Sequence, residues 1–142
     1  MGNAVFVAAM LELPTMAFFS KMSEKINCGT LIKFSILMFC VKHALTYFAT
    51  NMIMIYLAQV CQMFAYALFI PASVYYVNEK IALADRIKGQ SLVTTSMTLS
   101  GVFANFAGGI MLDALGVGHV LLAGIILSIV GAVIVILTTE KV

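Results

Sequence analysis

Long apolar stretches alternate with short polar ones along the whole chain. A helix that crosses a bilayer needs roughly 20 largely apolar residues at a rise of about 1.5 Å each. Five stretches meet this length, and they cover residues 2–19, 31–49, 52–77, 91–112 and 120–137. The pattern therefore predicts an all-α membrane protein with about five transmembrane helices, which together take up most of the chain.

Composition supports the same class. Hydrophobic residues make up 63% of the 142 residues and charged residues only 10%, whereas about a quarter of the residues of soluble domains are charged. A soluble fold could not cover so much apolar surface, so we expect the lipid bilayer to surround the chain and exclude a soluble enzyme. The net charge of +2 and the scattered basic residues argue against nucleic acid as a partner.

Basic residues mark alternate loops, and cytoplasmic loops collect lysine and arginine. They flank the first and third loops and the C-terminus, whereas the second and fourth turns have none. These residues are Lys21, Lys25, Lys33, Lys80, Arg86, Lys88 and Lys141. We expect these loops and the C-terminus in the cytoplasm and Met1 on the opposite side. Five spans with an external N-terminus and no basic leader suggest a fragment of a larger protein.

The fourth apolar stretch carries a row of small and polar residues at spacings of three and four. They are Thr94, Thr98, Gly101, Asn105 and Gly109. Helices in lipid associate through small residues that let their backbones approach, so we expect helix packing at Gly101, Asn105 and Gly109. Gly124 and Gly131 suggest the same for the fifth stretch. The alternative is that small residues are common in membrane helices, which suffices for any single glycine.

Two charged residues lie well inside apolar stretches, away from the ends, where a charge costs at least about 2.5 kcal/mol. Glu12 sits near the middle of the first stretch, two residues before Pro14, which disrupts helix hydrogen bonding. Glu12 is either a ligand for a substrate or proton, or a neutral glutamic acid buried in the bundle. Lys42 either lines a cavity, with Glu12 as its candidate partner, or extends toward the outer interface. We expect the neighbouring His43 to be a packed side chain.

The third stretch carries a polar stripe on one helical face, because Gln59, Gln62 and Tyr66 are spaced at i, i+3 and i+7. The stripe either lines a cavity for an uncharged polar solute or forms hydrogen bonds between helices. No motif of a hydrolase, metalloprotease or nucleotide-binding loop is present. The three cysteines have no CxxC spacing, so we treat them as small apolar side chains and expect no metal and no cofactor.

Two loop sequences carry a resemblance to a known family. Residues 84–91 read ADRIKGQS and residues 107–116 read AGGIMLDALG. Both are similar to conserved loops in the C-terminal half of major facilitator superfamily transporters, with the chain starting at the eighth of twelve helices. The resemblance implies part of a six-helix half, alternating access about a midplane site, and a missing N-terminal half as partner.

A narrower likeness is to the lactose permease branch of oligosaccharide and nucleoside proton symporters. Glu12 occupies the position of the eighth-helix glutamate, and Lys42 stands where that branch has a ninth-helix arginine. Gln62 and Ala65 replace the histidine and glutamate of its tenth helix, so Glu12 is the remaining candidate proton carrier.

This likeness implies a transporter of a small polar solute, sugar or nucleoside-like, coupled to protons, in the bacterial inner (plasma) membrane. The alternative is a small structural membrane protein that packs against partners without transport activity.

Overall fold

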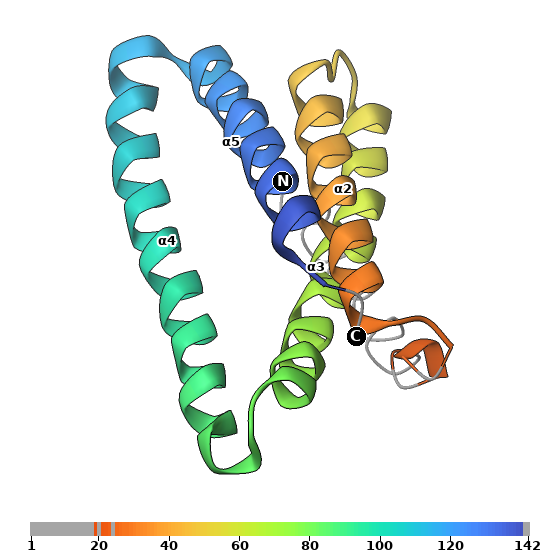
Figure 1. Ribbon diagram of the computed structural model, residues 1–142. Coiled ribbons are helices and arrows are strands. Elements are labelled where there is room, and N and C mark those ends of the chain that lie inside the picture. The colour runs from red at the N-terminus through yellow and green to blue at the C-terminus, as the bar shows by residue number, and fades with distance from the viewer. Residues whose placement is uncertain (1–18, 20, 24, 141–142) are drawn as a thin grey trace.

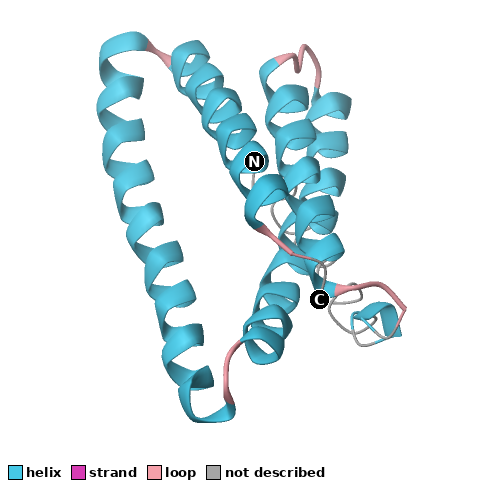
Figure 2. Cartoon of the chain, in the orientation of Figure 1, coloured by secondary structure: helices cyan, strands magenta, loops and turns pink. Residues whose placement is uncertain are grey.

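The computed structural model describes residues 19, 21–23 and 25–140 (Figures 1 and 2). The helices after residue 27, with one short 3-10 turn, are α2 (Cys28–Tyr47), α3 (Met52–Lys80), η1 (Leu83–Asp85), α4 (Arg86–Leu115) and α5 (Val117–Thr138). No β-strand occurs in this part of the chain. The first expected span, residues 2–19, lies outside the described residues except for Phe19, which is helical.

Four of the described helices are long and apolar enough to cross a membrane. Consecutive helices run in opposite directions, so their ends gather at two levels (Figure 1). These features confirm the prediction of an all-α membrane protein. The helices also extend past the apolar stretches: α4 begins at Arg86 and α3 ends at Lys80. The main-chain hydrogen bonds of a helix continue into the headgroup region, where polar side chains are tolerated.

The turns at one end of the bundle are short. Asn51 precedes α3, and its side-chain oxygen accepts a hydrogen bond of 3.0 Å from the Met54 amide, which caps the helix. Between α4 and α5 the chain reverses at Gly116, whose φ of 81° lies in the region that favours glycine. One residue therefore suffices to connect two long helices.

Helices α2 and α3 form the most closely packed pair. Three alanines of α3, seven residues apart, are buried: Ala58, Ala65 and Ala72. Leu68 on the same face is fully buried and packs in a cluster with Leu31 of α2. Small residues at this spacing let two helix backbones approach, which is the main source of helix association in lipid.

Helix α5 packs on the other side of α2. A Cβ built on Gly124 would lie 3.3 Å from Cδ2 of His43, so this glycine is a contact point. Nearby, the Cys40 thiol donates a hydrogen bond of 3.3 Å to the carbonyl of Ser128. The His43 ring also lies 2.8 Å from the carbonyl of Phe39 through Nδ1. The structure therefore confirms His43 as a packed side chain.

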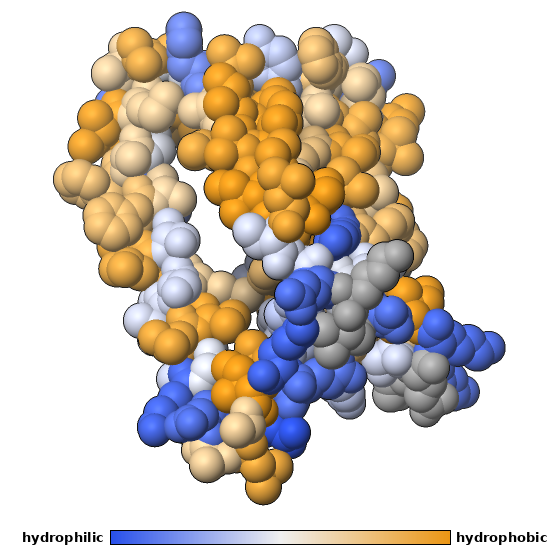
Figure 3. Space-filling view, viewed as in Figure 1, coloured by the Kyte–Doolittle hydropathy of each residue, from blue (hydrophilic) through white to orange (hydrophobic). Residues whose placement is uncertain are grey.

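Helix α4 stands apart from the other helices along most of its length (Figure 1). Gly89, close to its start, is its one buried residue. The space-filling view shows an open gap between α4 and α5 (Figure 3). The same view shows hydrophilic residues gathered where α3 ends, α4 begins and α5 ends, a level that we call the polar end.

Candidate functional site

The residues proposed for the solute and proton pathway lie in three parts of the sequence. Glu12 is outside the described residues. Lys42 is half-buried on α2, five residues before that helix ends at Tyr47. Gln59 and Gln62 are half-buried on α3, and Tyr66 is 44% exposed.

The two glutamine side chains carry unused hydrogen-bonding capacity. Neither Gln59 nor Gln62 forms a hydrogen bond with another described residue. An amide offers two donors and one acceptor oxygen with two lone pairs. The two amides are therefore available to a solute or to a polar group on a further helix, so both interpretations of the stripe stay open.

Tyr66 of the polar stripe lines a groove between α2, α3 and α4. The groove has a volume of about 610 Å³, within the usual range for small-molecule sites. Its lining residues are Ile36, Phe39, Tyr66, Phe69, Leu92, Val93, Ser96, Met97 and Ser100. The lining is therefore mostly apolar, with three hydroxyl groups as its polar contribution.

Aromatic rings form one wall of this groove. The Phe39 ring lies edge-on to Tyr66 at 6.2 Å and to Phe69 at 6.4 Å between centroids. Such arrangements are favourable for aromatic pairs and hold the rings in fixed orientations. The wall thus presents preorganised ring surfaces, with the Tyr66 hydroxyl as the polar group.

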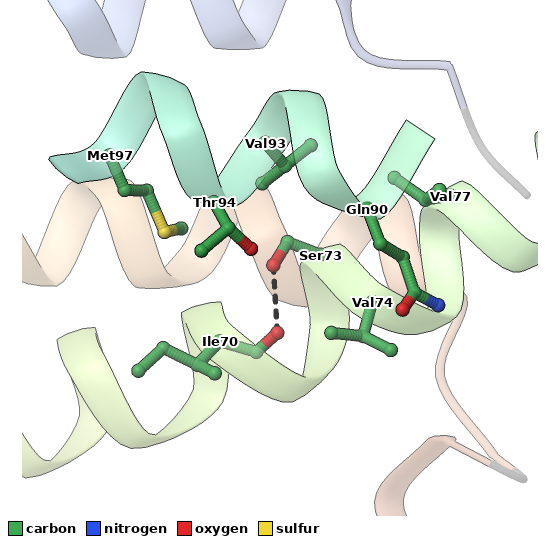
Figure 4. Close-up of a pocket in the computed structure, with 8 residues that line it drawn as sticks. All are labelled: Ile70, Ser73, Val74, Val77, Gln90, Val93, Thr94 and Met97. Atoms are coloured by element: carbon green, nitrogen blue, oxygen red, sulfur yellow. Dashed lines mark hydrogen bonds between the residues drawn. The ribbon is translucent and has the colours of Figure 1, made fainter. Parts of the chain in front are cut away.

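A second pocket of about 90 Å³ lies between α3 and α4 nearer the polar end (Figure 4). The Ser73 hydroxyl on its wall donates to the Ile70 carbonyl at 2.7 Å, within its own helix. The Gln90 amide donates to the Asn78 side-chain oxygen at 2.8 Å. Because both groups bond within the protein, this small pocket has less to offer a polar ligand than the larger groove.

The small-residue face of α4 lines the pocket against α3 at Thr94, but from Gly101 to Gly109 it is open toward the described residues. A Cβ built on Gly101 or on Gly109 would meet nothing within 4 Å, and Asn105 is exposed. A packing partner for this face would therefore lie outside the described part of the chain.

Sequence reasoning missed two packing features. Ala58, Ala65 and Ala72 of α3 are the first, because their seven-residue spacing is a signal of close helix packing. Gly29 is the second, because a Cβ there would overlap the carbonyl oxygen of Glu140. No local pattern could have revealed this contact, because its partner is more than a hundred residues away.

A comparison with protein families relates this architecture to known proteins. The family model described as Major Facilitator Superfamily matches residues 1–142. The chain belongs to the major facilitator superfamily. No curated protein and no solved structure gives a match.

Membership of the major facilitator superfamily makes the chain part of a transporter and points away from an enzyme. Together with the four membrane-crossing helices, it establishes an integral, multi-pass membrane protein in contact with the lipid bilayer. The broad family resemblance of the sequence is thereby confirmed. The C-terminal position and the lactose permease branch stay predictions.

Proposed function

We propose that the chain is part of the C-terminal half of a secondary transporter that moves a small polar solute by alternating access with proton coupling. The observation that carries the proposal is the placement of Lys42, a cation half-buried in a membrane-crossing helix. A charge at such a position is costly and usually marks a substrate or ion pathway. Glu12 supplies a carboxylate of opposite charge in the first apolar stretch.

The chemistry of the other candidate residues suits a sugar or nucleoside-like solute. The amides of Gln59 and Gln62 can donate to and accept from hydroxyl or base groups. Tyr66 and Phe39 offer ring surfaces for an apolar sugar face or a nucleobase. A solute with both polar edges and an apolar face would use both sets of groups.

Proton coupling is assigned to Glu12. Burial away from water raises the pKa of a carboxyl group, and a nearby cation lowers it. A carboxyl that faces water on alternate sides and approaches Lys42 in one state would take up and release a proton once per cycle. An N-terminal half of the transporter would complete the pathway.

The proposed orientation follows from the basic residues at the polar end. Lys80, Arg86 and Lys88 lie where α3 ends and α4 begins, and lysine and arginine favour the cytoplasmic side. The polar end and the C-terminus would then face the cytoplasm, with the protein in a bacterial plasma membrane.

The test uses the complete transporter in vesicles with an imposed proton gradient, with radiolabelled lactose and uridine as probes. Glu12→Gln should preserve folding, because glutamine resembles a neutral glutamic acid, and should abolish uphill accumulation. Lys42→Ala should weaken binding of the transported probe or shift its pH dependence. The matched control Glu79→Gln removes an exposed carboxylate near the end of α3 and should leave accumulation unchanged.

Full accumulation by a well-folded Glu12→Gln protein would remove Glu12 as the coupling group. Downhill exchange without accumulation in the native protein would indicate facilitated diffusion. The competing function, a structural membrane protein, draws support from the unoccupied small face of α4, and absence of any exchange by the folded native protein would favour it.

A further inference from the structure

The groove between α2, α3 and α4 lies at the middle of the membrane-crossing helices. Tyr66 stands at the centre of α3 and Ser100 at the centre of α4, and both line the groove. Secondary transporters hold their substrates near the bilayer midplane. The groove therefore lies at the depth at which a transported solute is bound.

Two serines of this groove have unused hydroxyl groups. Of the six serines in α2 to α5, four donate a hydrogen bond of 2.7 or 2.8 Å to a carbonyl three or four residues earlier in their own helix. These four are Ser35, Ser73, Ser91 and Ser128. The other two are Ser96 and Ser100, and neither forms a hydrogen bond with a described residue. They lie four residues apart on one face of α4 and line the groove.

A third hydroxyl belongs to the α3 wall of the groove. The Tyr66 ring lies edge-on to Phe39, and its hydroxyl forms no hydrogen bond with a residue that the structure describes. The residues that line the groove include no charged side chain and no amide. A ligand in the groove therefore meets three hydroxyl groups, aromatic rings and otherwise apolar side chains.

This set of groups distinguishes between two classes of solute. A sugar carries a hydroxyl on nearly every carbon, so several of its hydroxyls would lie unpaired against apolar walls, which is unfavourable. A flat heteroaromatic ring has two apolar faces and carries its donors and acceptors only at its edge. Its faces can lie against the rings of Phe39 and Tyr66, while its edge bonds to the hydroxyl groups.

We propose that the groove binds an uncharged heteroaromatic ring and that Ser96 and Ser100 of α4 determine this specificity. Their hydroxyls donate to carbonyl oxygens of the ring or accept from its N–H groups, and the Tyr66 hydroxyl does the same from the α3 wall. The inference rests on the proposed function, because it names the class of solute that the pathway carries.

The specificity is tested by equilibrium binding of radiolabelled uracil and lactose to the complete transporter, without a proton gradient. Uracil is an uncharged heteroaromatic ring, and the native protein should bind it at least about tenfold more tightly than lactose. Ser96→Ala and Ser100→Ala should each weaken uracil binding about three- to tenfold, as expected for one neutral hydrogen bond, and should leave lactose binding unchanged.

Ser91→Ala is the matched control for these variants. Its hydroxyl already bonds to the Ile87 carbonyl at 2.8 Å, and Ser91 is not among the groove residues, so uracil binding should stay at the native level. Equal affinity of the native protein for uracil and lactose would overturn the proposal. So would native uracil binding by both well-folded variants, Ser96→Ala and Ser100→Ala.

A cysteine in the groove tests whether this space admits a solute. Met97 lines the groove. In the complete transporter with every native cysteine replaced by serine, Met97→Cys should react with a small maleimide in open membranes. Uracil should slow this reaction at least about fivefold, and lactose should not. A cysteine that stays unreactive in the folded protein would show that protein fills the groove and would refute the proposal.

These experiments and the test of proton coupling have separate outcomes. Binding and alkylation need no gradient, so a Glu12→Gln protein that still accumulates solute would remove Glu12 as the coupling group and leave the ring site standing. Loss of accumulation in Glu12→Gln together with native uracil binding in the serine variants would support coupling and overturn the ring site.

Discussion

Leu68→Ala tests whether the contact between α2 and α3 determines the stability of the fold. Leu68 is fully buried on α3 and belongs to a cluster with Phe19, Leu31, Ile32 and Ala72. Its side chain therefore fills space between helices. Alanine at this position would leave that space empty unless the helices collapse around it.

The cost of this change can be worked from the volume removed. In a bilayer the separated helices face lipid tails, so the hydrophobic transfer contribution is largely lost and the packing contribution stays. Removal of three carbon atoms leaves a cavity of about 80 Å³, and at about 24 cal/mol per Å³ this costs about 2 kcal/mol. The expected destabilisation is therefore about 2 kcal/mol.

The assay is reversible unfolding of the purified protein in mixed micelles, followed by helical circular dichroism. Leu99→Ala is the control because it makes the same chemical change on α4, where Leu99 is 54% exposed. A change at an exposed position costs within about 0.5 kcal/mol. Equal destabilisation by the two variants would refute the argument that packing at Leu68 stabilises the fold.

Three further predictions concern the other described parts. Gly101→Leu should leave the stability of the isolated chain unchanged, since a Cβ there meets no atom within 4 Å, and should lower the thermal stability of the complete transporter if this face packs there. In intact cells, a membrane-impermeant thiol reagent should label a cysteine placed at Gly116 but not one placed at Ala84. Labelling at Ala84 with protection at Gly116 would show that the proposed orientation is inverted. The Lys80 ammonium holds the pKa of the Glu140 carboxyl below its ordinary value of 4.5 by hydrogen bonding to it. The ion pair thus stabilises the folded state above pH 4.5 and is lost as the pH falls through that lowered pKa. The difference in melting temperature between native protein and Glu140→Gln should therefore stay constant from about pH 5.5 to 8 and shrink below about pH 4.

The helices were predictable because length and apolar content alone specify a membrane-crossing helix. The expected stretch 52–77 corresponds to α3 and the stretch 120–137 to α5 within three residues at each end. The helix ends were less predictable, because a helix does not stop where its side chains become polar. Arg86 at the start of α4 is an example.

The candidate site was only partly predictable. Polar residues in apolar stretches are conspicuous, so Lys42 and the stripe of α3 could be named from sequence. The surroundings of these residues could not be predicted, because the surroundings depend on which helices pack against one another. Tyr66 lies in the groove through its contact with Phe39 of α2, and nothing in the sequence pairs these two positions. The close approach of Gly29 and Glu140 is a further case, because more than a hundred residues separate the two positions.

The described contacts of α4 show how this helix is held beside the groove. At the polar end α4 packs closely against α3: a Cβ on Gly89 would lie 3.0 Å from Cγ1 of Val77, and the Gln90 amide donates a hydrogen bond to the Asn78 side chain. At its other end α4 joins α5 through Gly116 alone. Between these ends it forms one wall of the groove. Because α4 borders the groove between these two ends, the width of the groove depends on how α4 is oriented relative to α2 and α3.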